Sequence, residues 1–112
     1  MIKNITKNKI LAENEHFASS LFDKTLGLLK SDINKTFILQ TRFGIHTFGM
    51  KKEIDIIIIN KHKKIVKMKQ SLQPNRIFLW NPQFDLVIEL PKKSIEKSKS
   101  EIGDTLSFKT TL

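Results

Sequence analysis

The feature of this sequence that most constrains its fold is the run at residues 54–59, which reads IDIIII and ends in four successive isoleucines. Neighbouring side chains of a strand point to opposite faces of a sheet, so these isoleucines cannot all share one face. The run therefore predicts a strand that is covered on both faces, and we expect it to be the central strand. Each isoleucine that it buries contributes about 1.5 to 3 kcal/mol of transfer free energy.

Several other segments rich in β-branched or aromatic residues predict further strands. We expect these strands at residues 9–12, 36–40, 44–48, 65–68, 76–80, 86–90 and 105–109, with a hairpin turn at 60–64. Apolar residues recur at helical spacing over residues 17–29 and predict an amphipathic helix, whereas residues 94–100 form a polar link that suits a short helix. The expected fold is α+β, with one main helix near the N-terminus and a mostly antiparallel, curled or barrel-like sheet of six to seven strands.

Length and composition are those of an ordinary globular domain. The chain has 112 residues, of which 39% are hydrophobic and 28% charged, so we expect residues 1–112 to form a single domain. Cysteine is absent, which excludes disulfides and thiolate chemistry. No apolar stretch approaches the roughly 18 residues of a membrane span, and the N-terminal residues lack a signal-peptide core. We therefore expect a cytoplasmic protein with no membrane span.

The formal net charge of +9 raises the question of nucleic-acid binding. The lysines are scattered along the chain, and Arg42 and Arg76 are the only arginines. Arginine is the usual reader of bases because its planar group forms paired hydrogen bonds, whereas lysine offers a mobile point charge. The pattern favours a solvated basic surface and predicts that any nucleic-acid binding is weak and unspecific.

A series of short motifs resembles a known family. The motifs are GLL at 27–29, IHTFGM at 45–50, IDI at 54–56, then Leu72, Pro74 and Arg76, VIELP at 87–91 and IGD at 102–104. In this order and at these separations they are similar to the domain-of-unknown-function 192 family, also named UPF 0127, over about residues 12–108. The resemblance implies a small α+β domain with a barrel-like sheet and implies no established activity. Two turns depart from the family pattern, at residues 52–53 and 92–93, where a proline and a glycine are replaced.

The polar side chains within these motifs are the candidate ligand-binding residues: His46, Thr47, Asp55, Arg76 and Glu89. We expect His46, Asp55 and Arg76 to converge, because an isolated polar group beside an apolar strand would lack a hydrogen-bonding partner. Structural roles compete with this interpretation. Asp55 could organise a turn through backbone hydrogen bonds, and Glu89 could pair with Arg76 as a bridge. Asp104 after Gly103 is most simply a turn residue.

These observations support three hypotheses about function. The first is a non-enzymatic binding or accessory module with a polar pocket at one end of the sheet, whose partner is a small ligand or a protein. The second is a small hydrolase-like enzyme that uses the same cluster, and the third is a weak basic nucleic-acid-binding domain. No catalytic signature, phosphate loop or zinc spacing occurs in the sequence, so we expect no cofactor. A metal held by His46 and two carboxylates remains an alternative.

Overall fold

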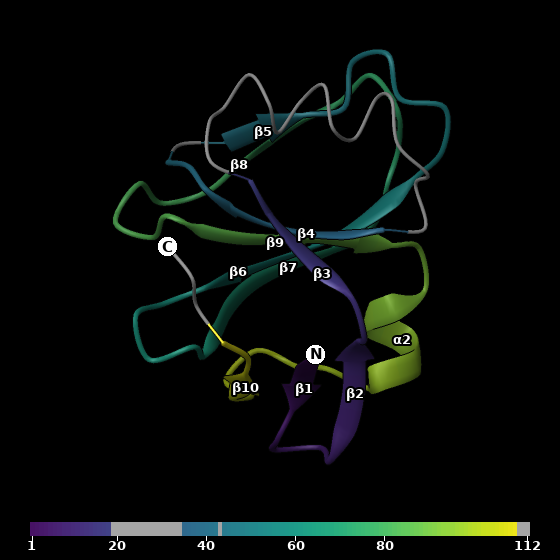
Figure 1. Cartoon of the computed structure of the whole chain (residues 1–112). Helices are drawn as coiled ribbons and strands as arrows, with labels where there is room; N and C mark the ends of the chain where they lie inside the picture. Colours follow the sequence, from purple (N-terminus) through teal and green to yellow (C-terminus); the bar gives the residue numbers. More distant parts are fainter. Residues whose placement is uncertain (19–34, 43, 110–112) are drawn as a thin grey trace.

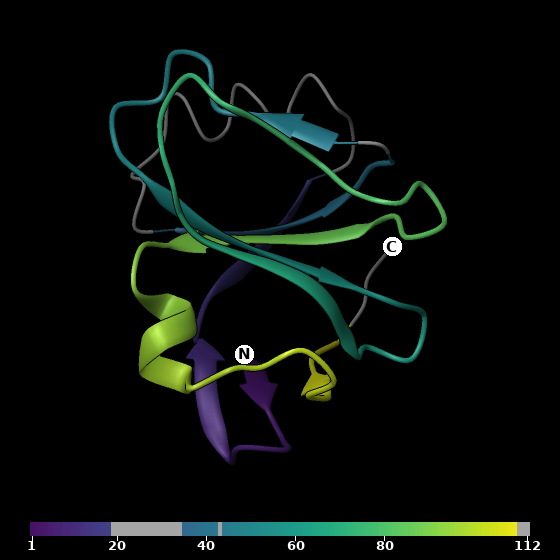
Figure 2. The same cartoon turned by 180° about the vertical axis from the view of Figure 1, so that it is seen from behind.

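The computed structural model describes residues 1–18, 35–42 and 44–109. Within them the strands form three sheets, and Figures 1 and 2 show the largest sheet lying between the two smaller ones. A three-stranded sheet below it has the order β10-β1-β2, and a two-stranded sheet above it pairs β5 with β8. The strands of these small sheets are β1 (Ile2–Asn4), β2 (Lys9–Ala12), β10 (Leu106–Ser107), β5 (Gly44–His46) and β8 (Ile77–Leu79).

The middle sheet has five strands in the order β3-β4-β9-β6-β7. Its strands are β3 (Glu15–Ala18), β4 (Thr36–Gln40), β9 (Leu86–Pro91), β6 (Ile54–Ile59) and β7 (Ile65–Leu72). All neighbours are antiparallel except β3 and β4, which run parallel. β9 therefore takes the central position, and the prediction that residues 54–59 form the central strand was wrong by one place.

β6 is nevertheless covered on both faces, as the isoleucine run predicts. All six of its residues are buried. Ile57 and Ile59 belong to one hydrophobic cluster, here called the lower core, with Ile2, Leu11, Ile88, Ile95 and Leu106 among its members. Ile54, Ile56 and Ile58 belong to a second cluster, the upper core, with Leu39, Met50, Trp80 and Val87. The alternation of one strand thus supplies two separate cores, one on each face of the five-stranded sheet.

A buried polar network ties the first strand to the C-terminal part of the chain. The side-chain amide of Asn4 donates to Ser100 Oγ at 2.9 Å and to Asp104 Oδ2 at 3.0 Å. The same carboxylate accepts from the backbone N–H of Glu101 at 2.9 Å, and Lys7 Nζ lies 3.4 Å from Asp104 Oδ1. Because these groups are satisfied by one another, they hold β1 against the turn before β10 at little desolvation cost.

The predicted helix and strand count need correction. The one helix within the described residues is α2 (Ser94–Ser98), near the C-terminus, where the polar link suits a short helix. Of the helix expected at residues 17–29, positions 17 and 18 are in β3, and positions 19–29 lie outside the described residues. The described part of the chain has ten strands in three sheets rather than six or seven in one barrel-like sheet. No helix in that part is long and apolar enough to span a membrane.

Candidate functional site

Asp55 braces three elements of the fold. Its side chain is fully buried, and its two oxygens accept from the backbone N–H groups of Ser71 and Ile95, each at 2.9 Å. Ser71 lies in β7 with φ 54°, and Ile95 lies in the first turn of α2. A carboxylate that accepts from two backbone donors is well compensated for burial. These contacts favour the structural interpretation of Asp55.

Thr47 joins two loops in a similar way. Its hydroxyl donates to the carbonyl of Gln73 at 2.7 Å and accepts from the backbone N–H of Arg76 at 2.9 Å. Its own N–H donates to the carbonyl of Arg76 at 2.9 Å, and its carbonyl accepts from Asn75. Thr47 is buried, whereas the side chain of Arg76 is exposed. Thr47 therefore contacts the backbone of Arg76 through both its hydroxyl and its own backbone, and these contacts do not involve the Arg76 side chain.

His46 is exposed and packs against Phe48. The two rings stack with centroids 4.8 Å apart, and the imidazole Nδ1 accepts from the backbone N–H of Phe48 at 3.3 Å. His46 also lies opposite Ile77 in the pairing of β5 with β8. It thus belongs to the outer surface of the two-stranded sheet.

The structure divides the five predicted site residues among three places. His46, Thr47 and Arg76 gather at one end of the β5–β8 sheet. Asp55 pairs with Leu90 of the lower core, whereas Glu89 pairs with Ile56 of the upper core, so the two carboxylates point to opposite faces of the five-stranded sheet. Within the described residues, no hydrogen bond or ion pair joins the side chains of His46, Asp55 and Arg76.

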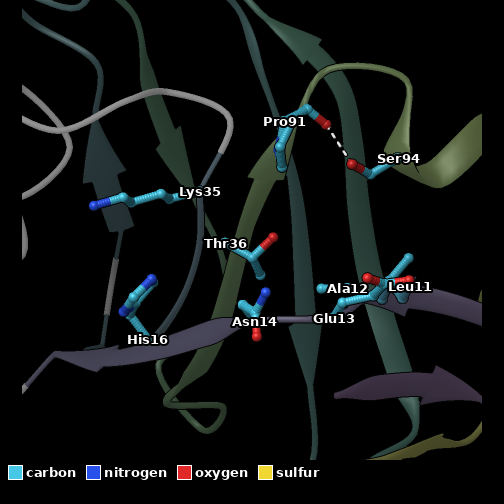
Figure 3. A pocket seen from close by; sticks show the side chains of 9 residues that line it. All are labelled: Leu11, Ala12, Glu13, Asn14, His16, Lys35, Thr36, Pro91 and Ser94. Carbon is cyan, nitrogen blue, oxygen red and sulfur yellow. Dashed lines mark hydrogen bonds between the residues drawn. The ribbon is translucent and has the colours of Figure 1, made fainter.

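A pocket of about 480 Å³ opens elsewhere, at the end of the five-stranded sheet where β3 and β4 begin and β9 ends. Its lining residues are Leu11, Ala12, Glu13, Asn14, His16, Lys35, Thr36, Pro91 and Ser94. Figure 3 shows Lys35 and His16 on one side and Leu11, Ala12 and Glu13 on the other, with Thr36 and Asn14 between them. The pocket size lies within the usual range of about 300 to 1,000 Å³ for small-ligand sites.

The parallel pairing of β3 with β4 brings the two basic side chains of this end pocket to one wall. His16 lies opposite Phe37, with ring centroids 5.5 Å apart, and Lys35, which directly precedes β4, lies on the same side of the pocket as His16 in Figure 3. On the other wall, the Ser94 hydroxyl donates to the carbonyl of Pro91 at 2.6 Å. The end pocket therefore has a basic wall with Lys35 and His16, facing a wall on which the acidic Glu13 adjoins the apolar Leu11 and Ala12.

Sequence reasoning did not find the end pocket. His16, Lys35 and Asn14 are ordinary surface residue types, and no short motif links them. They meet because β3 pairs with β4 across residues far apart in the chain.

In the part of the chain that the structure describes, no group of three or more His, Asp or Glu side chains is arranged to hold a metal ion. A second hollow of about 540 Å³ lies beside the turn between β6 and β7 and is lined by Asn60, His62, Phe84 and Asp85 among others. Among the described residues that line it, Ile59 is the one buried core residue.

Comparison with known proteins places the sequence in a family. The model of DUF192, described as an uncharacterized ACR, matches residues 8–108. The chain belongs to the DUF192 family. The resemblance over residues 12–108 is thereby confirmed and extended. A UPF0127 protein of Pyrococcus furiosus is 29% identical over 111 residues, which cover 94% of this chain and 95% of that protein. A UPF0127 protein of Pyrococcus abyssi is 37% identical over 78 residues, which cover 66% of each chain.

Two solved structures share the fold of this DUF192 chain. A protein of unknown function from Novosphingobium aromaticivorans has a TM-score of 0.70 and 12% identity, covering 84% of this chain and 74% of that one. A protein from Sinorhizobium meliloti, provisionally described as a transcription regulator, has a TM-score of 0.72 and 14% identity, covering 83% and 79%. At such low identity the likeness shows the fold alone.

Proposed function

We propose that this DUF192 domain is a non-enzymatic binding module whose end pocket holds a small organic anion. The observation that supports the proposal is the placement of Lys35 and His16 along one wall of a pocket of ligand size. An ammonium group and an imidazole together favour a carboxylate or phosphate, because hydrogen bonds to ionised groups are about twice as strong as neutral ones.

The remaining lining residues suit the rest of such a ligand. Thr36 and Asn14 lie between the two walls and offer a hydroxyl and an amide for orientation. Leu11 and Ala12 are buried members of the lower core, so the wall that they form is apolar and firmly held. Glu13 at the far side would repel a second anionic group and accept a hydrogen bond from a ligand hydroxyl or ammonium group. The ligand expected is therefore a small molecule with one anionic end.

Binding is favoured over catalysis by how the pocket hydroxyls are used. A nucleophilic serine needs a base within hydrogen-bonding distance to take its proton. The hydroxyl of Ser94 instead donates to the carbonyl of Pro91, and that bond fixes the chain where β9 leads to α2. The hydrolase-like hypothesis thus gains no support from this serine.

Titration calorimetry with a panel of small anions tests the proposal. Inorganic phosphate, glycerol phosphate, succinate and acetate are suitable probes, with a neutral polyol as the negative control. The variants Lys35→Ala and His16→Ala should each weaken binding of the best probe by about tenfold, the loss expected for one charge-assisted contact. Lys9→Ala is the matched control, because Lys9 is an exposed lysine of β2 outside the pocket.

The melting temperatures of all three variants should equal that of the wild type, since His16, Lys35 and Lys9 are exposed. An equal loss of affinity in Lys9→Ala would mean that general charge attraction, not the pocket, holds the anion. An unchanged affinity in both Lys35→Ala and His16→Ala would also contradict the proposal.

A further inference from the structure

The outer surface of the β5–β8 sheet carries an unusual group of exposed apolar side chains. Ile77 and Leu79 are 61% and 60% exposed, and Phe48 is 48% exposed. Single exposed hydrophobic residues are common on proteins, whereas contiguous ones mark interaction surfaces. The question is therefore whether these three side chains adjoin.

Strand register shows that they do. Ile77 and Leu79 are two residues apart in β8 and so point to the same side, while Phe78 between them packs against the upper core. His46 lies opposite Ile77 and shares its side of the sheet. Because the ring of Phe48 stacks on His46, the surface continues from Leu79 through Ile77 to Phe48. We call Phe48, Ile77 and Leu79 the apolar face.

Gly44 keeps one end of the apolar face flat. It lies opposite Leu79, and a Cβ atom at Gly44 would approach Leu79 Cδ2 to 2.6 Å and the carbonyl oxygen of Phe78 to 2.7 Å. Leu79 thus lies across the glycine. Any side chain at position 44 would push Leu79 out of this position.

Basic residues flank the segments that form the apolar face. The Nζ of Lys67 in β7 donates to the Leu79 carbonyl at 2.8 Å and lies 4.9 Å from the centre of the Phe78 ring, on the inner side of β8. Arg76 directly precedes Ile77, and exposed lysines follow Phe48 at positions 51 and 52. Glu53 is the one acidic residue in segments 48–53 and 76–79, and it accepts from Gln73. The two segments that supply the apolar face therefore carry more basic than acidic side chains.

We propose that the apolar face docks the protein onto an anionic phospholipid surface. Exposed Ile, Leu and Phe side chains can enter the headgroup boundary, while the exposed Lys51, Lys52 and Arg76 of the same segments meet lipid phosphates. Lysine suits a diffuse anionic surface, since it acts as a mobile point charge rather than a geometric fork. A second copy of the chain fits less well, because two sets of these basic side chains and two net charges of +9 would repel.

The apolar face and the end pocket lie on different sheets, so the two proposed sites are separate. In Figures 1 and 2 the β5–β8 sheet lies at one extreme of the molecule, and β1, β2 and β10 lie at the other. Docking through β5 and β8 would leave the lower core and its polar network facing away from the lipid.

Vesicle sedimentation tests the proposal. The probes are phosphatidylcholine vesicles with and without about one third phosphatidylserine, at low and at physiological salt. The wild type should bind the anionic vesicles, more weakly as salt rises, and should bind the neutral ones poorly. The double variant Ile77→Ser with Leu79→Ser should lower the anionic-vesicle binding constant by at least about tenfold.

Ile102→Ser is the matched control. Ile102 is 65% exposed, as exposed as Ile77, and lies in the turn before β10 at the other extreme of the molecule. It should change vesicle binding by less than about twofold. No binding of the wild type to anionic vesicles would overturn the proposal, as would equal losses in the control and the double variant.

Two further outcomes would also overturn it. Binding that salt abolishes but that the double variant leaves unchanged would show that charge alone acts. A concentration-dependent dimer, detected by sedimentation equilibrium and lost in the double variant, would assign the apolar face to self-association. Unchanged melting temperatures are expected for all variants, since each replaced side chain is exposed.

Discussion

At the scale of single residues, Asp55 and His46 come from neighbouring motifs and have opposite surroundings. Asp55 is fully buried and accepts from the N–H groups of Ser71 and Ile95, whereas His46 is exposed and stacks on Phe48. Removing a buried acceptor leaves its N–H donors without a hydrogen-bond partner, whereas water fills the place of an exposed ring that is removed. The two residues should therefore respond differently to mutation.

Asp55→Ala should lower the free energy of unfolding by about 2 to 4 kcal/mol, because two buried N–H donors lose their acceptor. Asp55→Asn should cost less, since one carbonyl oxygen remains. His46→Ala should stay within about 0.5 kcal/mol of the wild type. Urea unfolding measures all three, and a stable Asp55→Ala variant would show that the carboxylate does not brace α2 against β7.

Asp104 adds a dependence of stability on pH. Burial alone would raise its pKa, but hydrogen bonds from Asn4, from the Glu101 N–H and from Lys7 outweigh burial and hold the pKa below its ordinary value. A lowered pKa means that the folded state binds the proton less readily than the unfolded chain does. The contribution of Asp104 is therefore complete above the ordinary value of about 3.9 and is lost as the pH falls through the folded pKa.

Denaturant unfolding between neutral and acidic pH measures this contribution. Stability should decline below about pH 4, and Asp104→Asn should remove part of that decline while lowering stability at neutral pH. Equal acid dependence in the wild type and in Asp104→Asn would contradict the assignment.

At the scale of elements, β6 stabilises both cores through alternate side chains. Ile57 packs in the lower core and Ile58 in the upper core, each fully buried. The burial of both faces follows from the sequence, because four successive isoleucines place apolar side chains on both sides of the strand. The strand order does not follow from the sequence: β9 pairs with both β4 and β6 and is therefore the central strand.

Ile57→Ala and Ile58→Ala should each cost about 2 to 5 kcal/mol, because each leaves a cavity in a packed core. Ile77→Ala is the matched control, since the same residue type is exposed in β8, and it should cost less than about 0.5 kcal/mol. Thermal unfolding measures the three variants. A melting temperature unchanged in either β6 variant would mean that the corresponding core contributes little.

Other elements show where sequence patterns were sufficient and where they failed. The strands at 9–12, 36–40 and 54–59 were predicted at their observed bounds. The last two are rich in β-branched or aromatic residues, and the first is a short apolar run after Lys9. β1 has only three residues and carries no detectable alternation. β3 was missed because the spacing of Phe17 and Ala18 fits a helix, and its pairing with β4 depends on residues remote in the sequence.

The candidate site was predictable to a lesser degree than the fold. The motifs identified Asp55 and Thr47 as important, but their burial and partners decide what they do, and neither can be read from spacing. Asp55 and Glu89 were both predicted as candidate ligand-binding residues, yet register places them on opposite faces of the five-stranded sheet. The end pocket was invisible because Lys35 and His16 are brought together by a nonlocal pairing.

At the scale of the whole molecule, the three sheets separate a pocket at one edge from an apolar face at one extreme. Trp80 is buried in the upper core and donates its indole N–H to the Phe84 carbonyl at 2.7 Å, so it offers no exposed surface for stacking bases. Weak and unspecific nucleic-acid binding therefore stays the expectation for a net charge of +9. The central claim is that the end pocket binds a small organic anion.

Amide chemical shifts of the ¹⁵N-labelled protein, followed during titration with the best-binding small anion, test that claim most directly. The account predicts saturable shifts concentrated at Asn14, His16, Lys35, Thr36 and Ser94, which line the end pocket. The same titration of Lys35→Ala should show shifts that no longer saturate. Saturable shifts gathered instead at His46, Thr47 and Arg76, or small linear shifts spread over all the exposed lysines, would contradict it.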